Sequence, residues 1–232
     1  MFSGTLVLVG GNEWGEGTTF DQQLLEISGA QTVHILPTAQ AFENPKKAIE
    51  NARRWFSSLG ANIEPINVLS RSDANEEIYA DTLRDAKFIY LSGGSALHLK
   101  TALKNTPVYT AIIDAYRNGA VVAASSAAAM VLGDPMVDPR GGAFTTGLGL
   151  LKNFAAVPHF GRQSKERYDR TIKFAPPYVT LAAISEKTAL IRDPDGIWHK
   201  DGLGEVHLIK ESVEIDLTTF SLDPEAQTLV DS

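Results

Sequence analysis

The sequence predicts an α/β fold in which a mostly parallel β-sheet is covered by helices on both faces. Short, continuous apolar runs such as TLVLVG at residues 5–10 have the character of strands that are buried on both sides. These runs alternate with longer segments of helical periodicity through the first two-thirds of the chain. Because crossovers between parallel strands are right-handed, the alternation indicates a three-layer, doubly wound domain.

The predicted elements follow one another in a regular order. Strands are expected at 5–10, 32–38, 63–69, 87–92 and 120–125, and helices at 20–28, 45–59, 75–86, 96–104 and 109–118. After about residue 177 shorter strands are expected at 180–184, 188–192, 196–199, 204–210 and 212–217. Turn signals such as DPDG at 193–196 separate them, so we predict antiparallel hairpins that extend one edge of the sheet. No Pro- or Ser-rich linker interrupts the chain, which predicts a single domain over 1–232 with a frayed polar tail at 223–232.

Composition excludes several classes of protein. The 232 residues contain no cysteine, which excludes disulfides, a thiol nucleophile and a cysteine-based zinc site. The net charge of -7 argues against nucleic acid as a partner, because such binding needs clustered cations that neutralise phosphates. No histidine pair has metal-ligand spacing, and Gly10-Gly11 forms neither a dinucleotide-binding fingerprint nor a phosphate loop. We therefore expect neither a metal nor another cofactor.

Signals that direct a protein to membranes are not evident in the sequence. The N-terminus lacks a basic region, and the apolar run at residues 6–9 is shorter than the core of a signal peptide. No stretch approaches the ~20 apolar residues that span a bilayer. The expected location is cytoplasmic, with no membrane partner.

Two predicted strands end in runs of small residues, SGGS at 92–95 and AASSAAAM at 123–130. Ligands bind at the carboxyl ends of the strands in open α/β sheets, so both runs belong to a candidate site. A serine on a sharp strand-to-helix turn is exposed as a nucleophile when its neighbours are small, as Ala124 and Ala128 are around Ser126. The same pattern is also typical of serines that cap a helix, and the local pattern alone favours the cap.

Landmarks in one order along residues 5–210 carry a family resemblance. They are the opening strand ending in LVGG, YLSGG at 90–94, VVAASSAAAMVLGD at 121–134, GLGLL at 147–151 followed by PHF at 158–160, and ISEKTAL at 184–190. Together they resemble peptidase family S51, which contains peptidase E (aspartyl dipeptidase) and the cyanophycinase-like serine peptidases. The resemblance implies a class I glutamine amidotransferase-like, or flavodoxin-like, fold. The absent cysteine excludes an active class I amidotransferase.

The resemblance also implies roles for particular residues. Ser126 is similar to the family nucleophile, His159 to its general base and Glu186 to the acid that orients the histidine. The backbone N–H groups of Gly94 and Ala127 are expected to form the oxyanion hole. Ser125 is the alternative nucleophile if the register shifts by one residue.

Some residues depart from the family pattern. The family glycines on both sides of the nucleophile are Ala124 and Ala128 here. At a positive φ, an alanine costs of order 1 kcal/mol, and its methyl group can obstruct substrate. Ser95 and Ser185 stand where the family often has acidic or amide residues, which affects substrate contacts first. These changes leave open a catalytically impaired binding protein on the same scaffold.

The other four histidines are weaker candidates for a catalytic role. His34 lies inside a predicted strand, His98 on the helix after the Gly-Gly loop, and His199 and His207 in the C-terminal hairpins, where structural roles are expected. His159 differs, because it ends a short apolar run in a loop.

Cations after His159 are candidates for substrate recognition. Most of the charge at 162–170 is expected to be solvated, including Arg162. Arg167 and Arg170 are three residues apart on one helix, and peptidase E-like enzymes bind an acidic substrate residue. We therefore expect Arg170, with Arg167, to bind a substrate carboxylate. Further candidates are Ser95 and Arg140, the latter in a loop at 134–146 that we predict to act as a lid.

The interpretation favoured by these observations is a serine exopeptidase or dipeptidase acting on short peptides with an acidic residue, through an acyl-enzyme. The alternatives are a cyanophycinase-like β-aspartyl peptidase and the non-catalytic binding protein. The expected partner is a small peptide substrate, and the expected state is a monomer or homodimer.

Overall fold

The central sheet of the computed structural model, which describes residues 4–140 and 142–222, has seven strands in the order β13-β12-β1-β5-β4-β2-β3. Their bounds are β1 Thr5–Val9, β2 Thr32–Leu36, β3 Asn62–Pro65, β4 Phe88–Leu91, β5 Val121–Ser125, β12 Thr188–Arg192 and β13 Trp198–Gly202. β1 to β5 are mutually parallel, and β12 joins β1 in antiparallel pairing. The predicted mostly parallel α/β sheet is confirmed.

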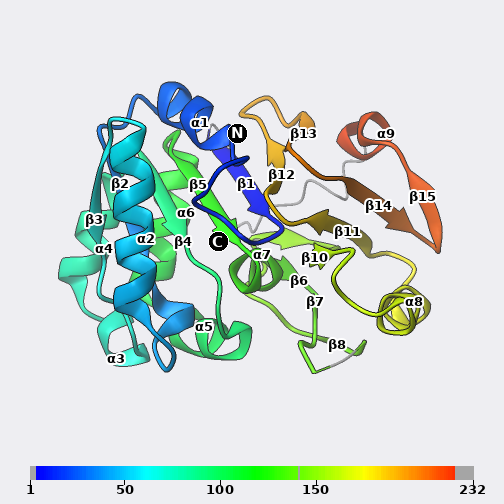
Figure 1. Ribbon diagram of the computed structural model, residues 1–232. Coiled ribbons are helices and arrows are strands. Elements are labelled where there is room, and N and C mark those ends of the chain that lie inside the picture. Colours follow the sequence, from blue (N-terminus) through cyan, green and yellow to red (C-terminus); the bar gives the residue numbers. More distant parts are fainter. Residues whose placement is uncertain (1–3, 141, 223–232) are drawn as a thin grey trace.

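Helices cover both faces of this sheet (Figure 1). Their bounds are α1 Phe20–Ser28, α2 Pro45–Ser58, α3 Arg71–Ala74, α4 Glu77–Arg84, α5 Ala96–Leu103, α6 Pro107–Arg117 and α7 Ala127–Leu132, with a 3-10 turn η1 at Thr38–Gln40. α1 and α2 pack one apolar cluster against the sheet, and α4 to α7 pack another on the opposite face. Asn44 and Thr106 accept capping hydrogen bonds before prolines at the first helical position, which fixes the starts of α2 and α6.

A second sheet of six strands lies beside the first, in the order β15-β14-β11-β10-β6-β9. Its strands are β6 Gly133–Asp134, β9 Leu151–Lys152, β10 Phe154–Phe160, β11 Thr180–Ser185, β14 Val206–Lys210 and β15 Val213–Ile215, and a small ribbon joins β7 Met136–Val137 to β8 Phe144–Thr145. The remaining helices are α8 Lys165–Phe174 and α9 Leu217–Leu222. One face of this sheet joins the main core, and the other packs with α8 in a separate apolar cluster.

The C-terminal strands differ in part from the predicted edge extension. β12 and β13 do extend the central sheet, but β11, β14 and β15 belong to the second sheet, and β11 runs parallel to β10. Strand β3 is also shorter than predicted, because the Val68 N–H donates to the Ile66 carbonyl at 2.8 Å and turns the chain. The predicted tail at 223–232 lies outside the described residues.

Among the described residues, no helix is both long and apolar enough to cross a bilayer. The cytoplasmic location and the single domain over 1–232 stay predictions.

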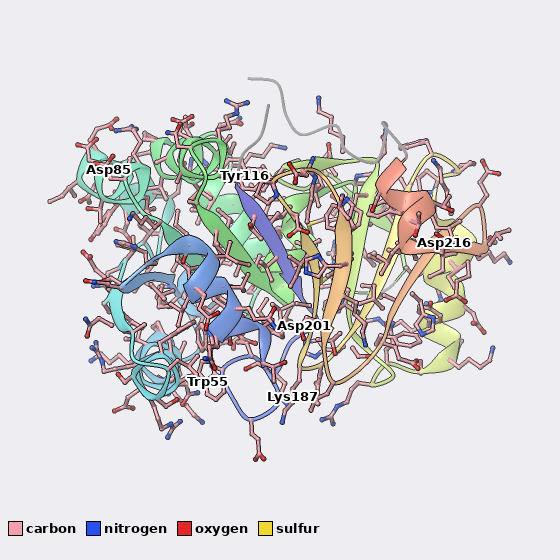
Figure 2. The ribbon with its side chains drawn as sticks, turned by 90° about the horizontal axis from the view of Figure 1, so that it is seen from above. Trp55, Asp85, Tyr116, Lys187, Asp201 and Asp216 are labelled. Carbon is pink, nitrogen blue, oxygen red and sulfur yellow. The ribbon has the colours of Figure 1, made fainter. Side chains whose placement is uncertain are left out.

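The topology gathers several chain segments at one edge. Val9 is paired with Ser125, and Leu91 with Ala124, so β1, β4 and β5 end side by side. The loop that follows β1 is hydrogen-bonded to the turn after β11. There the Lys187 ammonium donates to the Glu16 carbonyl at 2.8 Å (Figure 2 labels Lys187). This turn connects the second sheet to the first, so the edge is the place where the two sheets meet.

Candidate active site

Ser126 lies on a sharp turn between β5 and α7, with φ 52° and ψ -114°. Its N–H donates to the Val9 carbonyl at 2.8 Å, and its own carbonyl accepts from Met130 N at 3.1 Å. A Cβ on Gly93 would lie 3.1 Å from the Ser126 Cβ, so the glycine lets the neighbouring loop approach. This strained strand-to-helix turn is the conformation that exposes a nucleophilic serine.

The alanines beside Ser126 have ordinary backbone conformations. Ser126 itself has a positive φ, but neither Ala124 nor Ala128 does. Both alanines are fully buried in the main core and neither lines the pocket. The methyl groups therefore neither strain the turn nor obstruct the site.

His159 approaches from the second sheet. It lies at an irregularity in the pairing of β10 with β11, and its φ is 54°. Its N–H donates to the Gly10 carbonyl at 2.8 Å, which ties this irregularity to the end of β1. A Cβ on Gly11 would overlap the His159 ring, so the glycine leaves room for the imidazole.

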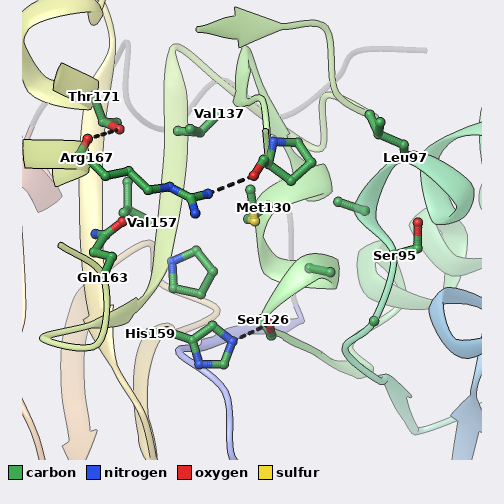
Figure 3. Close-up of a pocket in the computed structure, with 15 residues that line it drawn as sticks. Ser95, Leu97, Ser126, Met130, Val137, Val157, His159, Gln163, Arg167 and Thr171 are labelled. Atoms are coloured by element: carbon green, nitrogen blue, oxygen red, sulfur yellow. Dashed lines mark hydrogen bonds between the residues drawn. The ribbon is translucent and has the colours of Figure 1, made fainter. Parts of the chain in front are cut away.

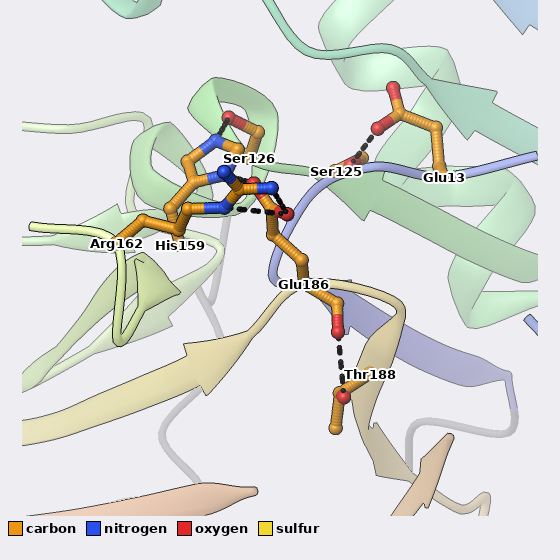
Figure 4. A network of polar contacts seen from close by, with 7 residues as sticks. All are labelled: Glu13, Ser125, Ser126, His159, Arg162, Glu186 and Thr188. Carbon is orange, nitrogen blue, oxygen red and sulfur yellow. Dashed lines mark hydrogen bonds and ion pairs between the residues drawn. The ribbon is translucent and has the colours of Figure 1, made fainter. Parts of the chain in front are cut away.

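Ser126, His159 and Glu186 form one chain of hydrogen bonds (Figure 4). The Ser126 Oγ lies 2.7 Å from His159 Nε2, and His159 Nδ1 lies 3.0 Å from Glu186 Oε1. With the proton on Nδ1, the imidazole donates to the carboxylate and accepts from the serine hydroxyl. The arrangement is chemically able to remove the serine proton while the carboxylate stabilises the imidazolium.

Glu186 is also held by a residue that the sequence analysis assigned to solvent. Arg162 donates to Glu186 Oε2 from Nε at 3.1 Å and from Nη2 at 2.9 Å. Burial opposes ionisation of Glu186, but the hydrogen bonds from His159 and Arg162 outweigh it and lower the pKa of the carboxyl below its usual value. The three-residue spacing from His159 to Arg162 could have indicated this contact, because it allows a tight turn. In that turn the main-chain N–H of Arg162 donates to the His159 carbonyl at 3.0 Å.

A pocket of about 290 Å³ opens beside Ser126 and His159 (Figure 3). The two residues expected to form the oxyanion hole, Gly94 and Ala127, line it, and so does Ser95. The Ser95 hydroxyl also caps α5 by accepting from His98 N at 3.3 Å. The volume is at the small end of the range of ligand pockets, about 300–1,000 Å³.

One arginine extends into this pocket. Arg167 on α8 donates from Nη2 to the Pro139 carbonyl at 2.8 Å, and its side chain crosses the pocket (Figure 3). Gln163, in the turn before α8, lines the same side of the pocket and was not among the residues expected there. Its amide nitrogen is buried and has no hydrogen-bond partner in the described part of the chain. Of these two side chains, Arg167 presents N–H donors to the pocket, whereas the Gln163 amide nitrogen is buried away from it.

The other expected cations lie outside the pocket lining. Arg170 donates to Glu166 Oε1 at 2.9 Å, four residues earlier on α8. Arg140 forms an ion pair with Asp138 at 2.7 Å, and its side chain is 78% exposed. Hydrogen bonds from Arg140 lower the pKa of Asp138 to about 2.

The segment at 134–146, of which residue 141 lies outside the described residues, forms one side of the pocket through Val137 and Pro139. It is tied to α5 by Lys100, whose ammonium donates to the Thr146 carbonyl at 3.0 Å. Its movement as a lid stays a prediction.

The other candidate residues have separate partners. The Ser125 hydroxyl is buried and donates to Glu13 Oε2 at 2.7 Å (Figure 4), so it does not face His159. The other histidines contact the Leu69 carbonyl (His98), Glu64 (His34), Asp193 (His199) and a pair of glutamates (His207), and none of them lines the pocket.

Comparison with known proteins identifies the family. Residues 6–198 match the model of peptidase family S51. The chain belongs to this family. Within that match lie all three residues of the hydrogen-bonded chain, Ser126, His159 and Glu186. The family establishes the chain as a serine-type peptidase, a hydrolase of peptide bonds.

Relatives of known sequence and structure agree with the S51 assignment. A cyanophycinase from Trichormus variabilis is 27% identical over 219 residues, which cover 88% of this chain and 72% of the relative. The crystal structure of a peptidase from an acI-B1 Actinobacterium is 30% identical, covers 92% of this chain and 93% of its own, and has a TM-score of 0.82. A solved structure of the peptidase E type from Listeria monocytogenes is 19% identical, covers 89% of this chain and 98% of its own, and shares the fold with a TM-score of 0.60.

Proposed function

We propose that this S51 peptidase is an exopeptidase that hydrolyses short peptides with an acidic residue, through Ser126, His159 and Glu186. The observation that carries the proposal is the 2.7 Å contact between Ser126 Oγ and His159 Nε2, on a turn that exposes the hydroxyl. A serine hydroxyl is a weak nucleophile at neutral pH unless a neighbouring imidazole takes its proton.

The reaction follows from the geometry. Ser126 Oγ attacks the carbonyl carbon of the peptide bond while its proton passes to His159 Nε2, and Glu186 stabilises the imidazolium. The N–H groups of Gly94 and Ala127 stabilise the oxyanion. The C–N bond then breaks, and the leaving amine takes the proton from His159. Water, deprotonated by His159, hydrolyses the acyl-enzyme and returns the hydroxyl to Ser126.

The shape and charge of the pocket support a short, acidic substrate. A volume of about 290 Å³ has room for a small part of a peptide. Arg167 uses one N–H on the Pro139 carbonyl, and a guanidinium has five donors, so others remain for a carboxylate. We therefore assign carboxylate binding to Arg167, in preference to Arg170 and Arg140.

The second candidate function is a cyanophycinase-like β-aspartyl peptidase. It is favoured by the cyanophycinases among the relatives of this chain. A β-aspartyl substrate differs in which carbonyl of the aspartate carries the peptide bond, and its free α-carboxylate would meet the same donors of Arg167.

Covalent labelling tests the nucleophile without knowledge of the substrate. After incubation with a fluorophosphonate, intact-mass spectrometry is expected to show one adduct on the wild type and on Ser57→Ala, which removes an exposed serine of α2. The Ser126→Ala variant is expected to show none. An adduct that persists on Ser126→Ala contradicts the assignment of the nucleophile.

A dipeptide panel tests the substrate. Asp-Xaa, Xaa-Asp and β-aspartyl dipeptides are compared with neutral dipeptides of the same length by kcat/KM. We expect the Asp-Xaa peptides to be cleaved fastest. Faster cleavage of β-aspartyl peptides favours the second candidate, and equal rates on acidic and neutral peptides contradict the assigned carboxylate subsite.

A further inference from the structure

The loop at residues 10–19, between β1 and α1, runs beside the proposed triad without lining the pocket. The Gly10 carbonyl accepts from His159 N, and the Gly11 carbonyl accepts from Lys187 N, each at 2.8 Å. These bonds fix the main chain two and three residues before Glu13. Glu13 therefore extends from a loop whose main chain is hydrogen-bonded to the second sheet through His159 and, through the Gly10 N–H and the Thr188 carbonyl, to the first.

The Glu13 carboxylate connects the ends of two neighbouring strands. Its Oε2 accepts from Ser125 Oγ at 2.7 Å, and its Oε1 accepts from Gly93 N at 3.3 Å (Figure 4 shows the first bond). Ser125 is the last residue of β5 and is fully buried, while Gly93 is the second residue after β4. No other side chain among the described residues bridges these two positions.

The two bridged residues precede the groups that act on the oxyanion. Gly93 comes directly before Gly94, and Ser125 directly before Ser126, which is followed by Ala127. An oxyanion hole is effective only if its donors are aligned beforehand on one point, and here the donors belong to separate segments. We propose that Glu13 is a positioning residue that sets the separation of these two segments and so aligns the oxyanion hole. The inference rests on the proposed function of Ser126.

A carboxylate suits this role because of its hydrogen-bonding capacity. It accepts at both oxygens, so it satisfies the Ser125 hydroxyl and the Gly93 N–H at once. The amide of Glu13→Gln keeps one acceptor for Gly93 and offers its NH₂ to the Ser125 oxygen, so it preserves the bridge in part. Glu13→Ala removes the bridge entirely. The expected order of activity is wild type, then Gln, then Ala.

The test combines labelling with steady-state kinetics. The second-order rate of fluorophosphonate labelling at Ser126, and kcat and KM on the best dipeptide of the panel, are measured for Glu13→Ala, Glu13→Gln and the wild type. We expect Glu13→Ala to lower kcat and the labelling rate about 10- to 100-fold, with KM changed less than about threefold, because the aligned donors act in the transition state. Glu13→Gln is expected to lie between the two.

Two controls separate this role from charge and folding. Glu16→Ala removes the same charge from an exposed position of the same loop and is expected to leave both rates within about twofold. Ser125→Ala removes one of the two bonds while keeping Glu13, and it is expected to give a smaller loss of kcat. It replaces Glu13→Ala if the latter does not fold, as judged by thermal unfolding.

The outcomes distinguish this inference from the proposed function. A wild type that labels at Ser126, with a Glu13→Ala variant of equal kcat and labelling rate, overturns the positioning role alone. A variant that raises KM at unchanged kcat also overturns it, since that result describes ground-state binding. A wild type that takes no label overturns the proposed nucleophile, and the positioning role with it.

Discussion

The two sides of the pocket are built in different ways. On one side, which we call the main-chain wall, Gly94, Ser126 and Ala127 are placed by backbone contacts at the ends of β4 and β5. On the other, which we call the side-chain wall, Arg167 reaches over the pocket from the surface helix α8, and Gln163 lines it from the turn before that helix. The groups of the first wall belong to the main chain and move only with the loops that carry them, whereas those of the second are replaced with a single side chain. If the proposed function holds, the chemistry depends on groups placed by the fold and the specificity on replaceable side chains.

Two of the residues that perform the proposed chemistry have a strained backbone. Ser126 and His159 both have positive φ, a conformation that costs non-glycine residues about 1–3 kcal/mol each. Their N–H groups are held by the carbonyls of Val9 and Gly10, at the end of the central strand β1. One buried strand therefore stabilises the strained backbone on both partners of the 2.7 Å contact.

The substitution expected to disturb the main-chain wall most is Gly94→Ala. The φ of Gly94 is 141°, and a Cβ there would overlap the Ala39 carbonyl oxygen, so Gly94→Ala displaces the loop that carries the proposed oxyanion donor. Loss of one such donor lowers kcat about 10²- to 10³-fold, and we expect an effect of that size. Labelling rates and kcat measure it.

The matched control for this prediction is Gly29→Ala. Gly29 also has a positive φ of 58°, but no atom lies within 4 Å of a Cβ built there, and it ends α1 away from the pocket. We expect it to lower stability by about 1 kcal/mol and to leave kcat unchanged. Equal losses of kcat in the two variants would show that backbone strain, and not the position of the loop, explains the effect of Gly94→Ala.

The sequence predicts the proposed catalytic residues better than it predicts the side chains of the side-chain wall. Ser126, His159 and Glu186 are recognisable because each lies in a short motif that resembles the S51 pattern, and the structure brings them together. Spacing did not separate Arg167 from Arg170, because the partners that decide their direction, the Pro139 carbonyl and Glu166, are chosen in three dimensions.

The second sheet is not predicted, because its pairings join segments that are distant in sequence. No strand is predicted at β10, and β11 is predicted as a strand but at the edge of the central sheet, since its buried apolar pattern resembles the strands there. Glu13 lies 112 residues from Ser125, and no local motif marks the bond between them.

The side-chain wall is tested by comparing two arginines of one helix. Arg167→Ala is expected to lower kcat/KM on acidic dipeptides about 10- to 100-fold, the size of a lost charge-assisted hydrogen bond, and to change neutral dipeptides less than about threefold. Arg170→Ala removes the same charge three residues away, outside the pocket lining, and is expected to change both less than about threefold. A larger loss with Arg170→Ala than with Arg167→Ala contradicts the assignment.

The smallest expected effect is the loss of stability on removing Arg162, whose exposed guanidinium pairs with Glu186. The Arg162 side chain is 70% exposed and that of Glu186 22%, so water screens the pair and its contribution is about 0.5–1 kcal/mol. Arg162→Ala is therefore expected to lower Tm by about 1–4 °C at pH 7. Thermal unfolding at several pH values measures it.

The pH dependence of this loss identifies its source. The folded pKa of Glu186 is lower than its usual value, so the stabilisation is complete above the unfolded pKa of about 4.3 and is lost as pH falls through the folded pKa. The difference in Tm between wild type and Arg162→Ala should therefore shrink towards zero under acidic conditions, where the carboxyl is protonated in both proteins. In a Glu186→Gln background the same substitution should have no pH-dependent effect. A difference that persists unchanged at low pH would mean that Arg162 stabilises the fold through packing and not through the charge of Glu186.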